Sequence, residues 1–152
     1  MIFEKIIIAL LMLLVSTLIH ALFMVGGAHA FEWRLRRFGP TKSHIDRALL
    51  IWLFTLWMFI AICIEVWLWA LVYLYNPAIS ELPDPQTAFY FSMVTFTSLG
   101  YGDVVLTGEW RTLASIQAAN GVIIFGWTTA LIFWVIQHIY IKESPPGGDK
   151  HV

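Results

Sequence analysis

Long apolar runs dominate the chain and alternate with short polar segments. A helix needs about 20 residues to cross a hydrocarbon core roughly 30 Å thick, so an apolar run of that length can span a membrane. Three runs reach it, at residues 6–25, 48–75 and 113–140. The first is interrupted by Ser16, Thr17 and His20, the second holds one charged residue, Glu65, and the third holds none. The pattern predicts an all-α membrane protein with three transmembrane helices per chain.

The composition agrees with this class. Hydrophobic residues make up 59% of the chain and charged residues 12%, against about 45–50% and about 25% in soluble domains. These values exclude an ordinary soluble protein. The net charge of −1 gives no reason to expect a nucleic-acid partner. The single cysteine, Cys63, excludes a disulfide framework or a thiolate metal cluster within one chain.

Basic residues are concentrated between the first and second spans. They are Arg34, Arg36, Arg37, Lys42 and Arg47. By the positive-inside rule this loop is cytoplasmic. With three spans, the N-terminus and residues 76–111 then lie outside and the C-terminal tail lies inside. We expect a multi-pass protein of the plasma or inner membrane.

The structure of residues 31–47 is left open by the sequence. Phe31, Leu35 and Phe38 share one helical face, which suits a short helix in the inner headgroup layer. A solvated basic loop fits equally well. In both cases the chain offers basic side chains that can bind anionic lipid, namely Arg34, Arg36 and Arg37.

A cleavable signal peptide over residues 1–30 is an alternative for the first span. The run Ala28-His29-Ala30 has the small residues of a cleavage site. Cleavage would leave the basic loop outside and reverse the charge rule. We therefore prefer an uncleaved N-terminal helix.

The segment between the second and third spans is too short and too polar to cross the membrane. Asp84 followed by Pro85 is typical of a helix start, with an N-cap residue before proline at the first helical position. About three helical turns follow over residues 86–97, and two glycines flanking Tyr101 then end the helix. Irregular backbone at membrane depth persists only where protein buries it or water lines it. The sequence therefore predicts a re-entrant loop beside an aqueous path.

The residues that end this loop carry a resemblance. The run Thr95-Phe96-Thr97-Ser98-Leu99-Gly100-Tyr101-Gly102-Asp103 resembles the selectivity filter of the potassium channel pore family. The run Gly121-Val122-Ile123-Ile124-Phe125-Gly126-Trp127-Thr128-Thr129-Ala130 is similar to the inner helix of bacterial two-transmembrane potassium channels. The likeness covers about residues 84–135. It implies a potassium-selective channel rather than an enzyme, with no cofactor besides the permeant K⁺.

The resemblance also implies how ions are bound. A dehydrated K⁺ needs a cage of carbonyl oxygens, and glycine permits backbone angles that aim successive carbonyls at one axis. One loop cannot form a ring, so a homotetramer around a single pore is implied. By the family correspondence K⁺ binds at Ser98, Leu99, Gly100 and Tyr101, with Gly102 completing the filter. We call residues 98–103 the filter segment.

Further roles follow from the same correspondence. Residues that support the filter segment are Tyr90, Phe91, Thr95, Thr97 and Asp103. Residues of the cavity and gate are Gly121 as a hinge, Phe125, Thr129 on the cavity wall and Phe133 at the inner bundle crossing.

The chain departs from the family pattern at several positions. Ser98 replaces the usual threonine, and Phe91 lacks the hydrogen-bond donor of the tryptophan pair that many members carry. Tyr90 still offers a hydroxyl, for which Asp103 is the expected partner. Val94 stands where some bacterial members have a carboxylate behind the filter.

The missing carboxylate draws attention to Glu65. An ionisable residue within a span is costly and usually faces protein or water. Glu65 lies in the outer half of the second span, near the depth of the filter segment. We hypothesise that it bonds Ser92, Thr95 or Tyr90 and so substitutes for the missing group; an interfacial glutamate without effect on conduction is the alternative.

The predicted organisation has four parts. They are an extra N-terminal transmembrane helix (1–30), a basic loop or interfacial helix (31–47), a pore domain (48–141) and a short tail (142–152). Within the pore domain we expect an outer helix at 48–75, a pore helix at 85–97, the filter segment at 98–103 and an inner helix at 110–141.

Other functions remain open from the sequence alone. A less selective monovalent cation channel or a non-conducting channel-like subunit would share the same features. A membrane haem protein is a remote alternative, because His20 and His138 lie toward the same ends of two spans and neutral imidazoles bind haem iron. No span carries regularly spaced arginine, so a voltage sensor of the usual kind is not expected.

Overall fold

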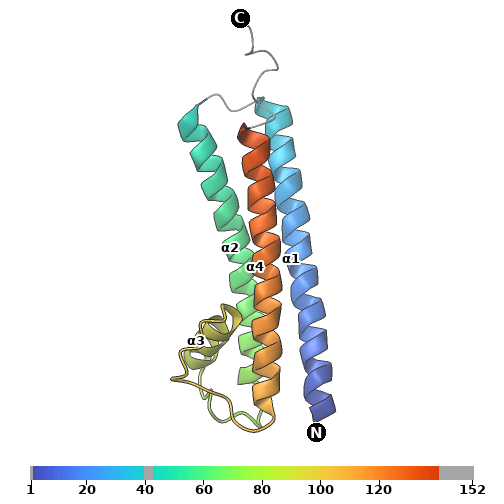
Figure 1. The fold of residues 1–152 in the computed structure, drawn as a ribbon, viewed down its shortest axis with the longest axis vertical. Coiled ribbons are helices and arrows are strands. Elements are labelled where there is room, and N and C mark those ends of the chain that lie inside the picture. Colours follow the sequence, from blue (N-terminus) through green and yellow to red (C-terminus); the bar gives the residue numbers. More distant parts are fainter. Residues whose placement is uncertain (1, 40–42, 141–152) are drawn as a thin grey trace, which may run out of the picture.

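A computed structural model describes residues 2–39 and 43–140. Within them the chain is all-helical, with α1 (Ile2–Phe38), α2 (His44–Leu74), α3 (Pro85–Phe96) and α4 (Trp110–Tyr140) (Figure 1). Three of these helices, α1, α2 and α4, are long and apolar enough to cross a membrane. This confirms the predicted all-α fold with three spans. The predicted tail at 142–152 and Lys42 lie outside the described residues.

The short helix and the first helix lie on different sides of the same pair. Both α1 and α3 pack against α2 and α4, whereas α1 and α3 do not contact each other. In Figure 1 α3 lies beside the half of α2 that is nearer to the start of α1 and of α4. A link from α1 to α3 must therefore pass through α2, α4 or a connecting loop.

The boundaries of α2 and α3 follow the predicted capping signals. Ser43 is the N-cap of α2, and its hydroxyl accepts a hydrogen bond from the Ile45 amide at 3.2 Å. Asp84 is the N-cap of α3, with Pro85 in the first turn. Its carboxylate accepts bonds from the Thr87 amide at 2.9 Å and the Thr87 hydroxyl at 2.7 Å. These contacts satisfy amides that a helix start otherwise leaves without partners.

The first helix is longer than the sequence predicted. It continues through residues 31–38, so these are neither a solvated loop nor a separate interfacial helix. Phe31 is buried and Leu35 packs beside it, in a cluster with residues of α2 and α4. Packing against two other helices extends the helix where charge patterning alone suggested a boundary.

One face of α1 is buried from Lys5 to Phe31. The buried positions are Lys5, Ala9, Ser16, His20, Gly27 and Phe31. They are separated alternately by four and seven residues, which is an 11-residue period of about 3.67 residues per turn. That period is close to the 3.6 of a straight helix, so one face of α1 stays against its neighbours without marked supercoiling.

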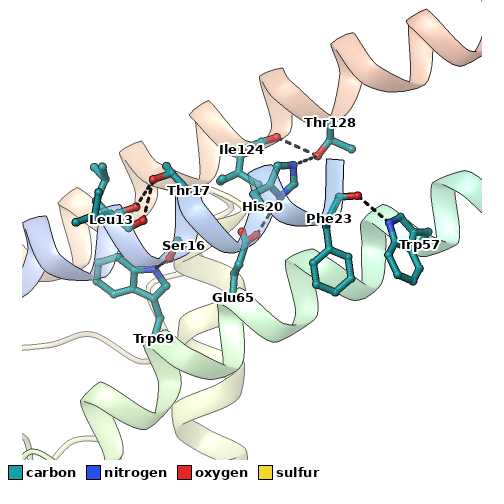
Figure 2. Close-up of polar contacts among 11 residues, drawn as sticks. Leu13, Ser16, Thr17, His20, Phe23, Trp57, Glu65, Trp69, Ile124 and Thr128 are labelled. Atoms are coloured by element: carbon teal, nitrogen blue, oxygen red, sulfur yellow. Dashed lines mark hydrogen bonds and ion pairs between the residues drawn. The ribbon is translucent and has the colours of Figure 1, made fainter. Parts of the chain in front are cut away.

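Polar contacts fasten α1 to both neighbouring spans. The Lys5 ammonium lies 3.4 Å from Glu109 and 4.8 Å from the centre of the Trp110 ring. Figure 2 shows two bonds to α2, from the Trp69 indole to the Ser16 hydroxyl at 3.1 Å and from the Trp57 indole to the Phe23 carbonyl at 3.0 Å. Without water, such bonds and close packing hold helices together in a membrane. These contacts join α1 to both neighbouring spans, and the choice between an uncleaved helix and a signal peptide remains a prediction.

Candidate functional site

The filter segment follows α3 through a tight turn. The amides of Ser98 and Leu99 donate to the carbonyls of Thr95 and Val94 at 2.9 and 3.0 Å, and the Gly100 amide also reaches Val94 at 3.3 Å. Through these bonds the backbone of residues 98–100 folds back against the last turn of α3. The filter segment therefore starts from a fixed position at the C-terminal end of α3.

The backbone of the filter segment alternates in handedness. Ser98, Gly100 and Gly102 have φ values of 57°, 55° and 79°, whereas Leu99 and Tyr101 between them have negative φ. Two of the three left-handed positions are glycines, which adopt such angles without steric cost. Alternating left- and right-handed residues place successive amides on one side of a chain and successive carbonyls on the other. The alternating sign of φ is compatible with a row of carbonyl oxygens along one side of the segment.

Ser98 is the one non-glycine residue with positive φ in the part of the chain that the structure describes. A β-branched side chain is strongly disfavoured in the left-handed region, and serine is less so. The serine at this position, in place of the family's threonine, therefore fits the backbone found here.

The filter segment lies on the surface of the single chain. Leu99 is 58% and Tyr101 71% exposed. On the other side, a hollow of about 200 Å³ is lined by Val94, Thr95, Gly100 and Gly102 among others. Val94 lies where the resemblance places a carboxylate in some bacterial members, and its apolar side chain lines this hollow without offering a hydrogen bond to the filter backbone.

Tyr90 and Asp103 form the contact that the sequence predicted. The Tyr90 hydroxyl donates to the Asp103 carboxylate at 2.7 Å. This bond holds the pKa of Asp103 below its ordinary value and, reciprocally, raises the pKa of Tyr90. The contact ties α3 to the last residue of the filter segment. Phe91, which has no donor, is instead buried with its ring edge against Tyr73, at a centroid distance of 5.3 Å.

A polar cluster that the sequence analysis missed holds α3 against α2 and α4. Gln117 of α4 accepts a bond from the Tyr73 hydroxyl at 2.8 Å and donates to the Ser92 hydroxyl at 2.6 Å. The Ser92 hydroxyl donates in turn to the Val66 carbonyl of α2 at 2.9 Å. Tyr73, Ser92 and Gln117 are fully buried. Glutamine within an otherwise apolar span was the available sequence signal for this cluster.

The neighbouring threonines take different positions. The Thr97 hydroxyl donates to the Met93 carbonyl at 2.8 Å, within the last turn of α3. Thr95 is half-buried and lines the hollow behind the filter segment. The structure thus places both beside the filter segment, while their predicted role in supporting it remains a prediction.

Gly121 lies where α4 passes closest to the end of α3. A Cβ at this position would lie 1.8 Å from the Phe96 carbonyl oxygen. Only glycine permits that approach, so packing accounts for this residue, whereas its predicted role as a hinge remains a prediction. The Phe96 ring also contacts Phe125 edge-on, at a centroid distance of 6.0 Å.

Two predicted cavity and gate residues lie on an open face of α4. Thr129 and Phe133 are exposed in the single chain, whereas Thr128 is buried toward α1. The Thr129 hydroxyl donates to the Phe125 carbonyl at 2.8 Å. This face of α4 is therefore available to line a space between several copies of the chain.

The expected partner of Glu65 is wrong. Its carboxylate lies 3.0 Å from the His20 ring of α1 and not against Ser92, Thr95 or Tyr90. Glu65 and Val66 point about 100° apart on α2. The backbone carbonyl of Val66 accepts a bond from Ser92 of α3, whereas the Glu65 side chain is directed to His20 of α1. Glu65 consequently does not replace the carboxylate missing at Val94.

The haem alternative is not supported by the geometry. Both ring nitrogens of His20 lie within hydrogen-bond distance of protein groups, Glu65 and Thr128. His138 lies ten residues beyond Thr128 along α4, or about 15 Å of helix. The two histidines are not brought together.

The region from α2 to α4 matches a known protein family. The ion channel family matches residues 49–138, which include most of α2, all of α3, the filter segment and almost all of α4. Comparisons with curated proteins and with solved structures gave no match. The match covers more than half of the chain and leaves α1 outside it. With this match over more than half of its length and three helices long and apolar enough to span a membrane, the chain belongs to the ion channel family.

Proposed function

We propose that the protein conducts K⁺ selectively across the plasma or inner membrane, as a homotetramer with one central pore. The observation that carries this proposal is the alternating backbone of the filter segment, with positive φ at Ser98, Gly100 and Gly102. A row of carbonyl oxygens can replace the hydration shell of a potassium ion. The selective element is then neutral backbone, which agrees with a chain of net charge −1.

Four copies are needed because one chain supplies only one carbonyl at each level of the pore. The exposed Leu99 and Tyr101 would be covered by neighbouring copies, as irregular backbone inside a membrane requires. The exposed Thr129 and Phe133 would line the cavity and the inner constriction, with α3 directing its negative C-terminal end toward that cavity. Rotational symmetry closes such an assembly.

The proposed orientation places the filter segment outside and the end of α1 with Arg34, Arg36 and Arg37 in the cytoplasm. At that end an apolar groove of about 320 Å³ lies between α1 and α2, lined by Ala30 and Leu50 among others. An anionic lipid could place one acyl chain there, with its phosphate at the arginines one turn beyond.

A less selective cation channel is the second candidate. The hollow behind Gly100 and Gly102 favours it, because Val94 provides no polar brace for the filter backbone. The difference between the candidates lies in how firmly the carbonyls are held.

Two glycine substitutions test the proposal in protein reconstituted into vesicles. Gly100→Ala places a side chain on a residue with φ of +55°, whereas Gly26→Ala, in helix α1, meets nothing closer than Trp57 at 3.9 Å. We expect K⁺ flux to be lost in the first variant and kept in the second. Equal K⁺ flux in both variants, or none in the native protein, would contradict the proposal.

A further inference from the structure

Three polar side chains from three helices meet inside the membrane-spanning part of the chain (Figure 2). His20 of α1 lies with Nδ1 3.0 Å from Glu65 Oε1 of α2 and with Nε2 3.1 Å from Thr128 Oγ1 of α4. His20 and Glu65 are fully buried and Thr128 nearly so. The three residues, which we call the His20 triad, are the point where α1 contacts both spans of the channel domain through ionisable or hydroxyl groups.

The hydrogen bonds of the His20 triad fix how many protons it holds. The Thr128 hydroxyl also lies 2.9 Å from the Ile124 carbonyl, to which it donates. A hydroxyl has one hydrogen, so Nε2 of His20 must then carry a proton and donate to Thr128. The contact between Nδ1 and Glu65 needs a second proton, on the ring or on the carboxyl group. In either form the pair holds two protons and has no net charge.

Removal of one proton changes the contact with α4. A singly protonated ring facing a carboxylate must place its hydrogen on Nδ1, which leaves Nε2 as an acceptor. Thr128 must then turn its hydroxyl from the Ile124 carbonyl to His20. A threonine bonded to the carbonyl four residues earlier bends a helix, so the proton count of the pair is coupled to the local shape of α4.

The surroundings favour the neutral pair. Apart from Glu65, no Asp, Glu, Lys or Arg occurs in residues 6–25 of α1, in residues 48–74 of α2, in α3, or in residues 112–140 of α4. The other histidine in these ranges is His138. The ring of Trp127 lies 6.4 Å from that of His20, between ring centroids. Glu65 Oε2 is buried without a hydrogen-bond partner in the structure. An unpartnered oxygen costs less on a neutral carboxylic acid than on a carboxylate.

We propose that the His20 triad is a proton-binding site through which α1 regulates the channel. Binding of one proton directs the Thr128 hydroxyl to Ile124, and its release directs the hydroxyl to His20. Thr128 precedes Thr129, which faces the proposed cavity, so the change reaches α4 at the level of the pore. The regulatory part rests on the proposed function, whereas proton binding does not.

Spectroscopy on the full-length reconstituted protein tests proton binding without any current. We expect either a carboxylic acid carbonyl band in the infrared spectrum that Glu65→Gln removes, or an imidazolium ¹⁵N signal that His20→Gln removes. The signal should disappear in a single one-proton step as pH rises. The control Glu81→Gln, at a half-buried loop carboxylate, should leave it in place. A neutral ring beside a carboxylate at every pH would overturn the proposal.

Current recordings test the regulatory part. Thr128→Val keeps the shape of the side chain but removes the hydroxyl, and we expect it to abolish the pH response of open probability that this site provides. Thr128→Ser should retain that response. The control His29→Gln, at an exposed position on α1, should leave it unchanged. Identical pH responses in native and Thr128→Val channels would overturn the regulatory part. If the protein shows proton binding at Glu65 but no K⁺ current, the result would count against the proposed function alone.

Discussion

The Tyr90 hydroxyl donates a hydrogen bond of 2.7 Å to the Asp103 carboxylate and so joins α3 to the end of the filter segment. The two residues are 13 positions apart and enclose all of the residues proposed to bind K⁺. The contact closes the filter segment into a loop, with α3 at one end and this bond at the other.

This contact predicts how conduction depends on pH. The pKa of Asp103 is held low by the Tyr90 hydroxyl, so stability from the contact is present above the unfolded-state pKa of about 3.9 and is lost only as pH falls through the lower folded value. We expect native currents to persist in mildly acid solution. Tyr90→Phe removes the bond and returns the Asp103 pKa toward its ordinary value.

The expected result for Tyr90→Phe is a current that declines over time and fails at a higher pH than the native current. Recordings across an acid pH series measure both effects. Tyr75→Phe, at an exposed tyrosine outside the filter segment, is the matched control. Native behaviour in Tyr90→Phe would show that the contact does not support conduction.

The close approach at Gly121 predicts a loss of stability on substitution. A Cβ would lie 1.8 Å from the Phe96 carbonyl oxygen, so α4 and α3 must separate in Gly121→Ala. Overpacking of this kind costs about 1–3 kcal/mol or more. Thermal unfolding in detergent measures the loss, and Gly126→Ala on the same helix, where a Cβ meets nothing within 4 Å, is the control. If Gly121 served only as a hinge, the two variants would unfold alike.

The buried amide of Gln117 predicts a second loss. Gln117→Leu leaves the Tyr73 hydroxyl without its acceptor and removes one partner of Ser92. A buried polar group without a partner costs about 1–3 kcal/mol. We expect lower thermal stability together with reduced conduction, because α3 is no longer held to α4. The control Gln137→Leu, at an exposed position of α4, should retain native thermal stability and conduction. Equal effects of the two substitutions would show that the buried polar cluster does not hold α3 to α4.

The left-handed backbone of Ser98 predicts an unusual result for the family's own residue. Threonine is β-branched and tolerates a φ of +57° poorly. Ser98→Thr should therefore destabilise the filter segment, by less than the roughly 1–2 kcal/mol that left-handed backbone costs any residue with a Cβ, because serine already bears that cost. Ser98→Gly should relieve the backbone while removing the hydroxyl. We expect the threonine variant to conduct for a shorter time than the native channel. Longer-lived conduction in Ser98→Thr would contradict the backbone found here.

Features set by local chemistry could be predicted from the sequence. Asp84 followed by Pro85 placed the start of α3, and the three spans followed from apolar length alone. The contact between Tyr90 and Asp103 followed from the family resemblance, since both lie beside the filter segment. In each case the residues responsible for the feature are either close together in sequence or part of a known sequence motif.

Features set by the packing of α1 could not be predicted in the same way. A helix that is apolar all round gives no direction from its hydrophobic pattern, so the sequence predicts a partner for Glu65 on α3, whereas the structure shows it on α1. Polar residues held the missed signal: Lys5, Ser16 and His20 repeat at spacings of 11 and 4 residues and mark the buried face. The order of the helices around α2 depends on tertiary contacts, which no single segment encodes.

The central claim is that the filter segment selects K⁺ by its carbonyl oxygens. The most direct measurement is the reversal potential of the reconstituted protein under opposed K⁺ and Na⁺ gradients. We predict a current that reverses near the K⁺ equilibrium potential and is lost in Gly100→Ala. A reversal potential that follows Na⁺, or the absence of any current from the native protein, would contradict the claim.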